Sequence, residues 1–169
     1  MAKRQVGPIE GGEVRLRLLE EADLPMTLAW RNEDHIRKWF LHSDIITEEQ
    51  HRSWFDRYSR RDDDFVFIIE ETEDLWKPVG QISLYNIDWG QRTAEYGRLM
   101  IGERDAVGKR LAKKATKLLL DYAFGSLGLE KIELEVLSGN APALAIYRSC
   151  GFFEVSERDG LKKMIKVAR

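Results

Sequence analysis

The first regular pattern along the chain is an alternation of apolar and basic residues through VRLRLL (14–19). This alternation predicts a strand with one buried face. Asp23 and Pro25 favour the start of a helix, because aspartate is a common N-cap and proline is tolerated in the first turn. A second short helix or a loop is expected at 35–40. Residues 1–13 lack such a pattern, and we expect them to form a flexible polar lead-in.

A capping box predicts where the next helix begins. The Thr47 hydroxyl can cap this helix while the Gln50 side chain reaches back to the backbone of Thr47. Helical spacing then puts four large rings on one face: His51, Trp54, Phe55 and Tyr58. The charged turn at 60–64 follows, and we interpret its three aspartates as a solvated loop without a functional role.

In the second half of the chain, the spacing of apolar residues changes from that of strands to that of a helix and back to that of a strand. Strand-like runs at 65–70, 79–87 and 93–101, separated by short turn-like segments, predict an antiparallel meander. The later elements are a helix at 108–124, a strand at 132–137, a helix from Asn140 to Cys150 ended by Gly151, and a hairpin turning on Asp159 and Gly160. A strand, a helix and a strand across 93–137 require a right-handed parallel crossover. We therefore predict an α/β fold: one domain over 14–169, with a mixed sheet and helices on its faces.

Composition and charge narrow the class of protein. The chain has 169 residues, of which 43% are hydrophobic and 33% charged, and its net charge is −2. Such values are typical of a globular domain and argue against a basic nucleic-acid binder. Apolar runs are too short to span a bilayer, and no signal-peptide pattern is present. We expect a cytoplasmic protein with neither a membrane nor nucleic acid as a partner.

Cysteine and histidine usage gives no sign of a metal site. The single cysteine, Cys150, excludes an internal disulfide, and we interpret it as a packing residue. The three histidines (His35, His42 and His51) lack the spacing of metal ligands. No metal is therefore expected.

A basic segment follows the strand at 93–101. Six basic residues lie between Glu103 and Lys117 against two acids, at the predicted start of a helix that contains the flexible Gly108. Backbone N–H groups and positive charge at a helix N-terminus suit a phosphate or pyrophosphate. The alternative is a solvated basic helix face, and the charge pattern alone favours neither.

The segment NAPALAIYRSCGF (140–152) alone indicates a capped amphipathic helix with Tyr147 in the core. Together with the basic segment, however, it resembles the GNAT superfamily of acyl-CoA-dependent N-acyltransferases, and the resemblance covers 14–169. The pattern N-x-x-A-x-x-x-Y-x-x-x-G-F is met throughout, by Asn140, Ala143, Tyr147, Gly151 and Phe152. The phosphate loop departs from the family, because Val107 stands where Gln or Arg is usual and Arg110 where Gly is usual.

The resemblance implies a GNAT-like fold, with a mostly antiparallel sheet and one parallel strand pair splayed for CoA, and an acetyl-CoA-dependent N-acetyltransferase. In such an enzyme the pantetheine arm would pair with Leu99, Met100 and Ile101. The pyrophosphate would lie on 107–112, with lysines near the adenosine phosphates. The further candidates for CoA contacts are Val107, Gly108, Lys109, Arg110, Leu111, Ala112, Lys113, Lys114 and Asn140.

The chemistry requires a neutral amine, a base and an acid for the departing thiolate. The resemblance makes Tyr147 the acid and places Glu95 near the acceptor amine, where it would act through water. His51 is a second candidate for the base, because an ordinary histidine titrates near neutral pH.

The acceptor pocket would be built from the first helices and their loop. Aromatic rings and arginines there suit a stacked sugar or base and a phosphate; the candidates are Trp30, Arg31, Asn32, Arg37, Trp39, His51 and Trp54. The pattern resembles N-acetyltransferases that act on nucleotide-linked amino sugars, and this is the leading expectation for the acceptor.

Other interpretations stay open. The N-terminal half also resembles ribosomal-protein N-terminal acetyltransferases and spermidine acetyltransferases. A polyamine would need carboxylates, and five are available: Glu33, Asp34, Asp44, Glu48 and Glu49. Two alternatives of another class are a non-catalytic acyl-CoA-binding module and a domain that binds nucleic acid or protein through its basic helix. A homodimer is possible.

Overall fold

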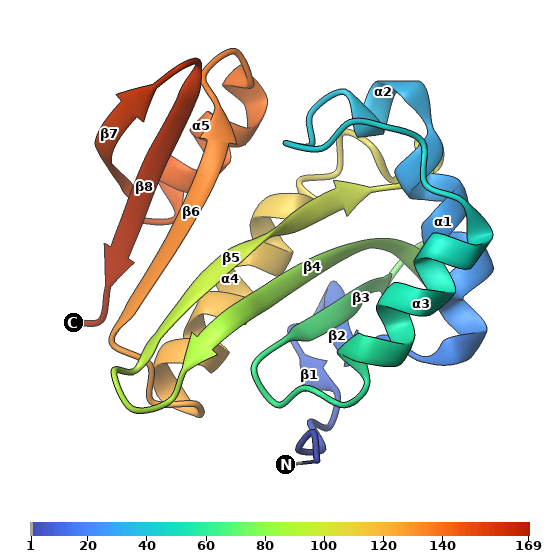
Figure 1. The fold of residues 1–169 in the computed structure, drawn as a ribbon, viewed down its shortest axis with the longest axis horizontal. Coiled ribbons are helices and arrows are strands. Elements are labelled where there is room, and N and C mark those ends of the chain that lie inside the picture. The colour runs from blue at the N-terminus through green and yellow to red at the C-terminus, as the bar shows by residue number, and fades with distance from the viewer. Residues whose placement is uncertain (1) are drawn as a thin grey trace.

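The structure is a computed structural model that describes residues 2–169. One sheet of eight strands runs through it in the order β1-β2-β3-β4-β5-β6-β8-β7 (Figure 1). Neighbouring strands are antiparallel except β5 and β6, which are parallel. The strands are β1 (Ile9–Glu10), β2 (Val14–Leu18), β3 (Phe65–Glu71), β4 (Lys77–Asp88), β5 (Thr93–Ile101), β6 (Lys131–Leu137), β7 (Phe153–Arg158) and β8 (Leu161–Val167).

Helices cover both faces of this sheet, as the sequence predicts. One face carries α4 (Leu111–Gly125) and α5 (Ala141–Ser149), while α1 (Leu24–Asn32), α2 (Asp34–Arg37) and α3 (Glu48–Tyr58) lie on the other (Figure 1). Short 3₁₀ turns precede α1 at Glu21–Asp23 and α4 at Arg104–Ala106. Within residues 2–169, none of the helices is long and apolar enough to cross a membrane.

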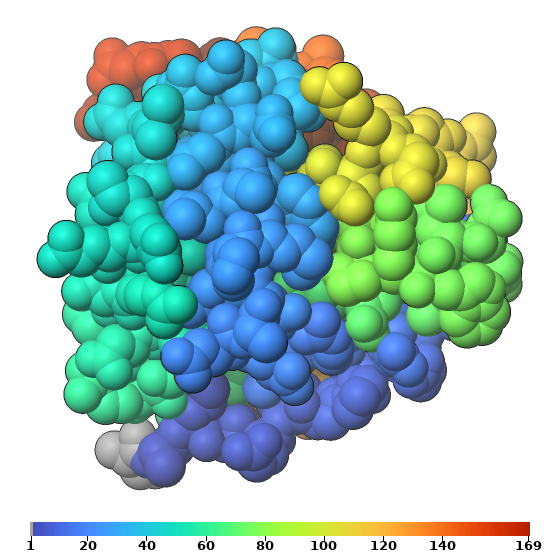
Figure 2. All heavy atoms as spheres, turned by 90° about the vertical axis from the view of Figure 1, so that its right-hand side faces the viewer, coloured from blue at the N-terminus to red at the C-terminus, as the bar shows by residue number. Residues whose placement is uncertain are grey.

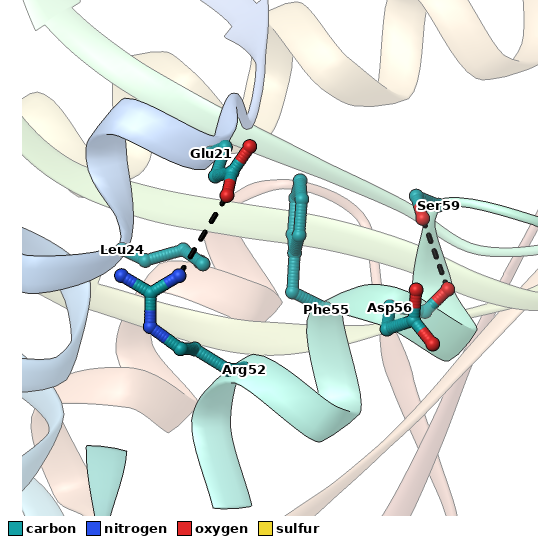
Figure 3. A pocket seen from close by; sticks show the side chains of 6 residues that line it. All are labelled: Glu21, Leu24, Arg52, Phe55, Asp56 and Ser59. Carbon is teal, nitrogen blue, oxygen red and sulfur yellow. Dashed lines mark hydrogen bonds and ion pairs between the residues drawn. The ribbon is translucent and has the colours of Figure 1, made fainter. Parts of the chain in front are cut away.

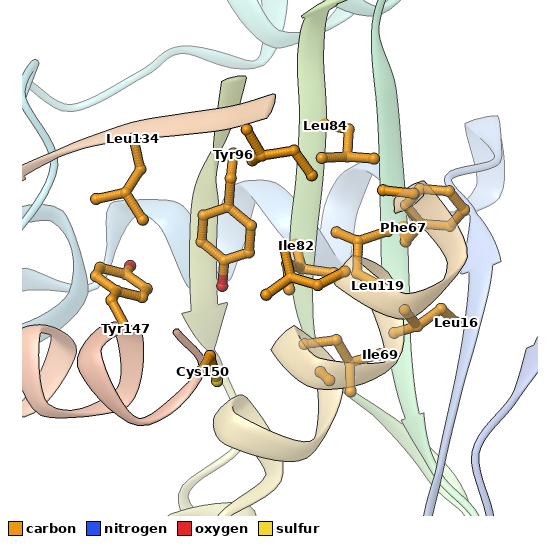
Figure 4. Packing of buried hydrophobic residues seen from close by; sticks show 14 of the residues in the cluster. Leu16, Phe67, Ile69, Ile82, Leu84, Tyr96, Leu119, Leu134, Tyr147 and Cys150 are labelled. Carbon is orange, nitrogen blue, oxygen red and sulfur yellow. The ribbon is translucent and has the colours of Figure 1, made fainter. Parts of the chain in front are cut away.

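Because side chains alternate between the two faces of the sheet, the hydrophobic core has one layer on each face. On the α4 face, Phe67 of β3, Ile82 of β4 and Tyr96 of β5 pack in one cluster with Leu119 of α4 (Figure 4). On the other face, a smaller cluster forms around Ile68. Because side chains alternate, Tyr85 and Glu95 point toward the face that carries α1 to α3.

The structure confirms the predicted helix caps and the predicted hairpin turn. The Thr47 hydroxyl accepts the backbone N–H of Gln50, and the Gln50 side chain accepts that of Thr47. The Asn140 side chain caps α5. Asp159 and Gly160 have φ values of 54° and 77°, as a two-residue hairpin turn requires.

Three expectations need correction. The lead-in is tied to the fold: β1 pairs with β2, and Arg4 is ion-paired to Asp62 at 2.8 Å. The aspartate turn is not simply solvated, because Asp64 is only 4% exposed. Helix α4 begins at Leu111 rather than at residue 108, since Gly108 and Arg110 both adopt left-handed backbone conformations (φ 85° and 61°).

Candidate functional site

The two parallel strands separate after three residue pairs. Thr93, Ala94 and Glu95 of β5 pair with residues 131–133 of β6, and no pairing follows beyond Glu95. Residues 96–101 and 134–137 therefore diverge, leaving what we call the β5–β6 opening (Figure 1). Backbone groups on its two edges are available to an extended ligand.

Tyr147 lies beside this opening, on α5. Its ring meets Tyr96 edge-on, with centroids 5.5 Å apart, and also packs against Phe152 (Figure 4). The side chain is 7% exposed, and burial raises the pKa of its hydroxyl well above the ordinary value. Tyr147 therefore keeps its proton at neutral pH and can act as a proton donor.

Glu95 ends the paired part of β5, on the face opposite Tyr96. One carboxylate oxygen accepts a hydrogen bond from Asn86 Nδ2 at 3.1 Å. Its charge contributes to raising the pKa of the Tyr85 hydroxyl, after the larger effect of burial, and so does the charge of Glu135 on β6. Glu95 is the register partner of Tyr85, and Glu135 lies on β6 two residues beyond the partner of Glu95, so both carboxylates point to the same face of the sheet as Tyr85.

Sequence analysis missed three residues of this face: Tyr85, Arg98 and Asp64. The Arg98 guanidinium binds both carboxylate oxygens of Asp64 and lies 4.4 Å from the Tyr85 ring centre. No local pattern could have revealed this group, because Asp64 and Arg98 are 34 residues apart and were assigned to a loop and a strand.

The predicted phosphate loop lies between β5 and α4, next to α1 and residues 72–78 (Figure 2). Lys77 pairs with Glu103 and Asp105, and Lys109 with Asp74. Lys114 pairs with Glu13. Across residues 2–169, Arg104, Arg110, Lys113 and Lys117 make no ion pair, so these side chains retain free positive charge for an anion.

The backbone of this loop fits a phosphate-bearing ligand. Val107 is 66% exposed, and a Cβ at Gly108 would meet no atom within 4 Å. The first N–H groups of α4 follow at Leu111 and Ala112, where an anion is favoured. The residues present therefore suit the pyrophosphate of CoA, although Val107 and Arg110 are unusual for the family.

Arg110 carries backbone strain, which gives a first prediction. An L-residue in the left-handed region costs roughly 1–2 kcal/mol, a penalty that glycine escapes. We expect Arg110→Gly to raise the free energy of unfolding by about 0.5–1 kcal/mol, while Arg110→Ala gives no such gain. Urea denaturation of both variants measures the difference, and an alanine variant as stable as the glycine variant would contradict the prediction.

The strand segment expected along pantetheine is partly buried. Met100 is 5% exposed and packs with Trp30 and Ile36 toward α1 and α2, whereas Leu99 and Ile101 pack toward the α4 face. Their backbone lies at the edge of the opening, so their contacts with pantetheine stay a prediction.

The residues expected to line the acceptor pocket divide into two groups. Trp30 is 4% exposed and donates its indole N–H to Glu103 at 3.0 Å. The Asn32 side chain makes hydrogen bonds with the backbone N–H and C=O of Ile46, which fixes the loop before α3. Trp30 and Asn32 therefore pack or brace the structure.

The other members range from the exposed Trp39 to the buried Arg31. Trp39 is 41% exposed, and Arg37 pairs with Asp34. Trp54 is stacked between His51 and Tyr58, with ring centroids 5.6 and 5.0 Å away. Arg31 is 9% exposed, donates to the carbonyl of His42, and has one buried nitrogen, Nη1, without a hydrogen-bond partner. Burial lowers the pKa of its guanidinium.

His51 links two helices. Its Nε2 lies 2.9 Å from the Thr27 hydroxyl of α1, and its ring stacks on Trp54. Burial alone lowers the pKa of His51. Its role as a base stays a prediction, since the structure gives it no carboxylate partner among residues 2–169.

The lowered pKa makes protein stability pH-dependent. The unfolded chain takes up the His51 proton first, near pH 6.5, so stability is complete above this pH and falls as the pH drops toward the folded-state pKa. We expect His51→Gln to flatten the decline in unfolding free energy between about pH 6.5 and 5. Urea denaturation across this range tests it; an unchanged slope would contradict it.

A shallow depression lies apart from these residues. Arg52 and Glu21 meet at 3.6 Å across this depression between α3 and the start of α1, which is also lined by Leu24, Phe55, Asp56 and Ser59 (Figure 3). None of the predicted site residues lines it. The predicted acid Tyr147 and the predicted carboxylate Glu95 lie instead beside the end of the β5–β6 pairing.

Comparison with known proteins gives an independent result. The family described as "Acetyltransferase (GNAT) domain" matches residues 13–153. Spermidine N(1)-acetyltransferase from Vibrio cholerae is 26% identical over 142 residues, which cover 84% of this chain and 80% of that protein. The Escherichia coli K12 enzyme of the same name is 29% identical over 139 residues, covering 82% and 72%.

A solved structure shares the fold. The crystal structure of spermidine N-acetyltransferase from Vibrio cholerae in complex with CoA and spermine superposes with a TM-score of 0.82 at 24% identity, covering 92% of this chain and 95% of that one.

Proposed function

Because this chain belongs to the GNAT family of acetyltransferases, we propose that it acetylates a primary amine of a small cationic molecule of the polyamine class. Acetyl-CoA-dependent N-acetyl transfer is the activity of the protein, and the acceptor is the proposal. Its carrying observation is that Glu95, the register partner of Tyr85 on β5, and Glu135 of β6 lie on one face of the sheet at the two sides of the opening.

This acceptor replaces our leading expectation from sequence. An amino sugar on a nucleotide carrier needs open aromatic faces, but Trp30 is buried against Met100 and both faces of Trp54 are engaged by neighbouring rings. The names of the relatives from Vibrio cholerae and Escherichia coli favour a polyamine. Anionic groups near the amine fit the same class, because opposite charge attracts a protonated polyamine.

The residues suggest how the transfer proceeds. Glu95 takes the proton of the bound ammonium through a water molecule, which leaves a neutral amine to attack the thioester carbon. A backbone N–H near Met100 polarises the thioester carbonyl. As the C–S bond breaks, Tyr147 gives its proton to the departing thiolate, and the excess proton of the acetylated nitrogen returns through water to the Tyr147 oxygen, which restores the acid. Acetyl-CoA supplies the activated acetyl group, and the loop at 107–112 holds its pyrophosphate.

The test is a rate measurement with three amines. Thiol release from acetyl-CoA is followed with spermidine, a nucleotide-linked amino sugar and a peptide with a free N-terminus. We expect the highest kcat/KM with spermidine; a higher value with either competitor would contradict the acceptor proposal. Absence of turnover with every amine would favour an acyl-CoA-binding module, which calorimetric titration with acetyl-CoA detects.

Variants that each remove one carboxylate test whether Glu95 and Glu135 attract the acceptor. We expect Glu95→Gln and Glu135→Gln each to raise KM for spermidine about fivefold, the effect of roughly 1 kcal/mol. Glu95→Gln, which also removes the proposed base, should lower kcat as well. The matched control is Glu73→Gln, which removes an exposed carboxylate from the 72–76 turn. An equal rise in the control would mean that only the net charge of the protein matters.

A further inference from the structure

A bulge in β5 directs Arg98 toward the face of the sheet on which the acceptor is proposed to bind. Gly97 pairs with Ser83 and Met100 with Gln81, so two residues of β5 lie opposite the single residue Ile82. Arg98 is the extra residue and adopts a left-handed conformation with φ 55°. The Gln81 side chain donates to the carbonyl of Arg98 at 3.2 Å, which holds this bulge. Bulges of this kind re-aim a side chain.

The re-aimed guanidinium is fixed by a buried partner. Arg98 Nη1 donates to Asp64 Oδ1 at 2.7 Å and Nη2 to Oδ2 at 3.2 Å. Asp64 is 4% exposed, and its backbone carbonyl accepts a hydrogen bond from Lys3. A two-pronged arginine–carboxylate contact fixes the plane of the guanidinium as well as its position.

That plane lies against Tyr85. The Arg98 guanidinium is 4.4 Å from the Tyr85 ring centre and 5.6 Å from that of Trp54. On the strand side, a Cβ at Gly97 would lie only 2.9 Å from the Tyr85 hydroxyl oxygen. The tyrosine is thus held between the cation and the bare backbone of Gly97, where a larger residue would displace it.

This arrangement carries the Tyr85 hydroxyl to the opening. Tyr85 pairs with Glu95, the last residue of β5 that pairs with β6. The Tyr85 hydroxyl lies over Gly97, where β5 and β6 have already separated. Tyr147 lies on the other side of the sheet, where its ring packs on Tyr96. The Tyr85 hydroxyl therefore lies beside the opening, on the same face of the sheet as the proposed base Glu95.

We infer that Tyr85 binds the acceptor amine through its hydroxyl oxygen, and that Arg98 and Asp64 are positioning residues that hold its ring. This inference rests on the proposed function, since it places the acceptor at the β5–β6 opening. Burial, before the charges of Glu95 and Glu135, raises the pKa of Tyr85 above its ordinary value, so the hydroxyl stays neutral and can accept a hydrogen bond from an ammonium or amine. The ion pair with Asp64 neutralises Arg98, which would otherwise repel a cationic acceptor.

Steady-state kinetics of three variants test the inference, with acceptor and acetyl-CoA varied in turn. Tyr85→Phe removes only the hydroxyl and should lower kcat/KM for the acceptor at least tenfold, with KM for acetyl-CoA unchanged. Arg98→Lys keeps a charge for Asp64 but loses the planar contact, and should raise the acceptor KM about fivefold. Its kcat at saturating acceptor should fall less than its kcat/KM, a split that loss of folded protein would not produce.

The same turn offers a matched control. Asp62 forms an ion pair with Arg4, whose guanidinium lies 3.7 Å from the Trp89 ring centre, so the chemistry is the same but the site is remote. We expect Asp62→Asn to leave both KM values unchanged. Acceptor kcat/KM of Tyr85→Phe within twofold of wild type would overturn the inference.

The proposed polyamine acceptor and the proposed role of Tyr85 can be contradicted independently of each other. If the wild-type enzyme prefers another amine to spermidine, the proposed acceptor is wrong, and the kinetics are repeated with the preferred amine. An unchanged Tyr85→Phe enzyme then overturns the inference for that amine, while a tenfold loss supports it. If wild type turns over no amine, calorimetric binding of spermine to the CoA complex replaces the rates, and equal affinity of Tyr85→Phe and wild type overturns it.

Discussion

Replacing Tyr147 by phenylalanine is expected to lower kcat about 100-fold, at the low end of what a positioned general acid contributes. The substitution removes the hydroxyl and leaves the ring, which packs on Tyr96 and Phe152. Acetyl-CoA affinity should therefore be nearly unchanged. Single-turnover measurements separate the chemical step from product release.

The control and the pH profile sharpen this prediction. Tyr96→Phe removes a hydroxyl that lies 2.6 Å from Thr116 Oγ1 on the α4 face; we expect it to cost about 1 kcal/mol of stability while kcat is preserved. Because burial raises the pKa of Tyr147, its deprotonation should cause no loss of rate up to about pH 9. A Tyr147→Phe enzyme within twofold of wild-type kcat would rule out this acid.

The largest stability effect is expected for Trp30→Ala, with a loss of about 3–5 kcal/mol in the free energy of unfolding. Trp30 packs with Ile36 and Met100, and its ring fills the space where a Cβ of Gly102 would lie, at 2.1 Å. Its indole N–H also binds Glu103. The substitution leaves a cavity between α1 and residues 102–103, which precede the phosphate loop.

Trp39→Ala is the matched comparison, because this ring is 41% exposed. We expect it to change stability by less than about 0.5 kcal/mol. Urea denaturation followed by circular dichroism measures both. Equal stability of the two variants, with a raised acceptor KM in Trp30→Ala alone, would restore Trp30 as a substrate-stacking residue.

The comparison of these two tryptophans shows what the sequence could predict. Short-range signals were sufficient for the helix caps at Thr47 and Asn140, for the strand at 93–101 and for the hairpin turn, since each depends on neighbouring residues. The resemblance around Tyr147 led to the correct family. Which tryptophan is buried depends on tertiary packing, and no local pattern distinguishes Trp30 from Trp39.

The misjudged residues share a physical cause. Asp64 was interpreted as part of a solvated acidic turn because its partner Arg98 is distant in sequence. Arg98 itself looked like an ordinary strand residue, since alternation does not reveal a bulge. The start of α4 was placed at Gly108, before the first apolar residue Leu111, because no local pattern shows that Gly108 and Arg110 adopt left-handed conformations.

The anchored N-terminal segment has a consequence for how the enzyme is produced. Lys3 donates a hydrogen bond to the backbone carbonyl of Asp64, whose side chain holds Arg98. An affinity tag fused ahead of residue 2, or proteolytic trimming to residue 13, would thus act at the acceptor end of the enzyme. Recombinant protein with a C-terminal tag, beyond β8, avoids this coupling and is the better starting material for kinetics.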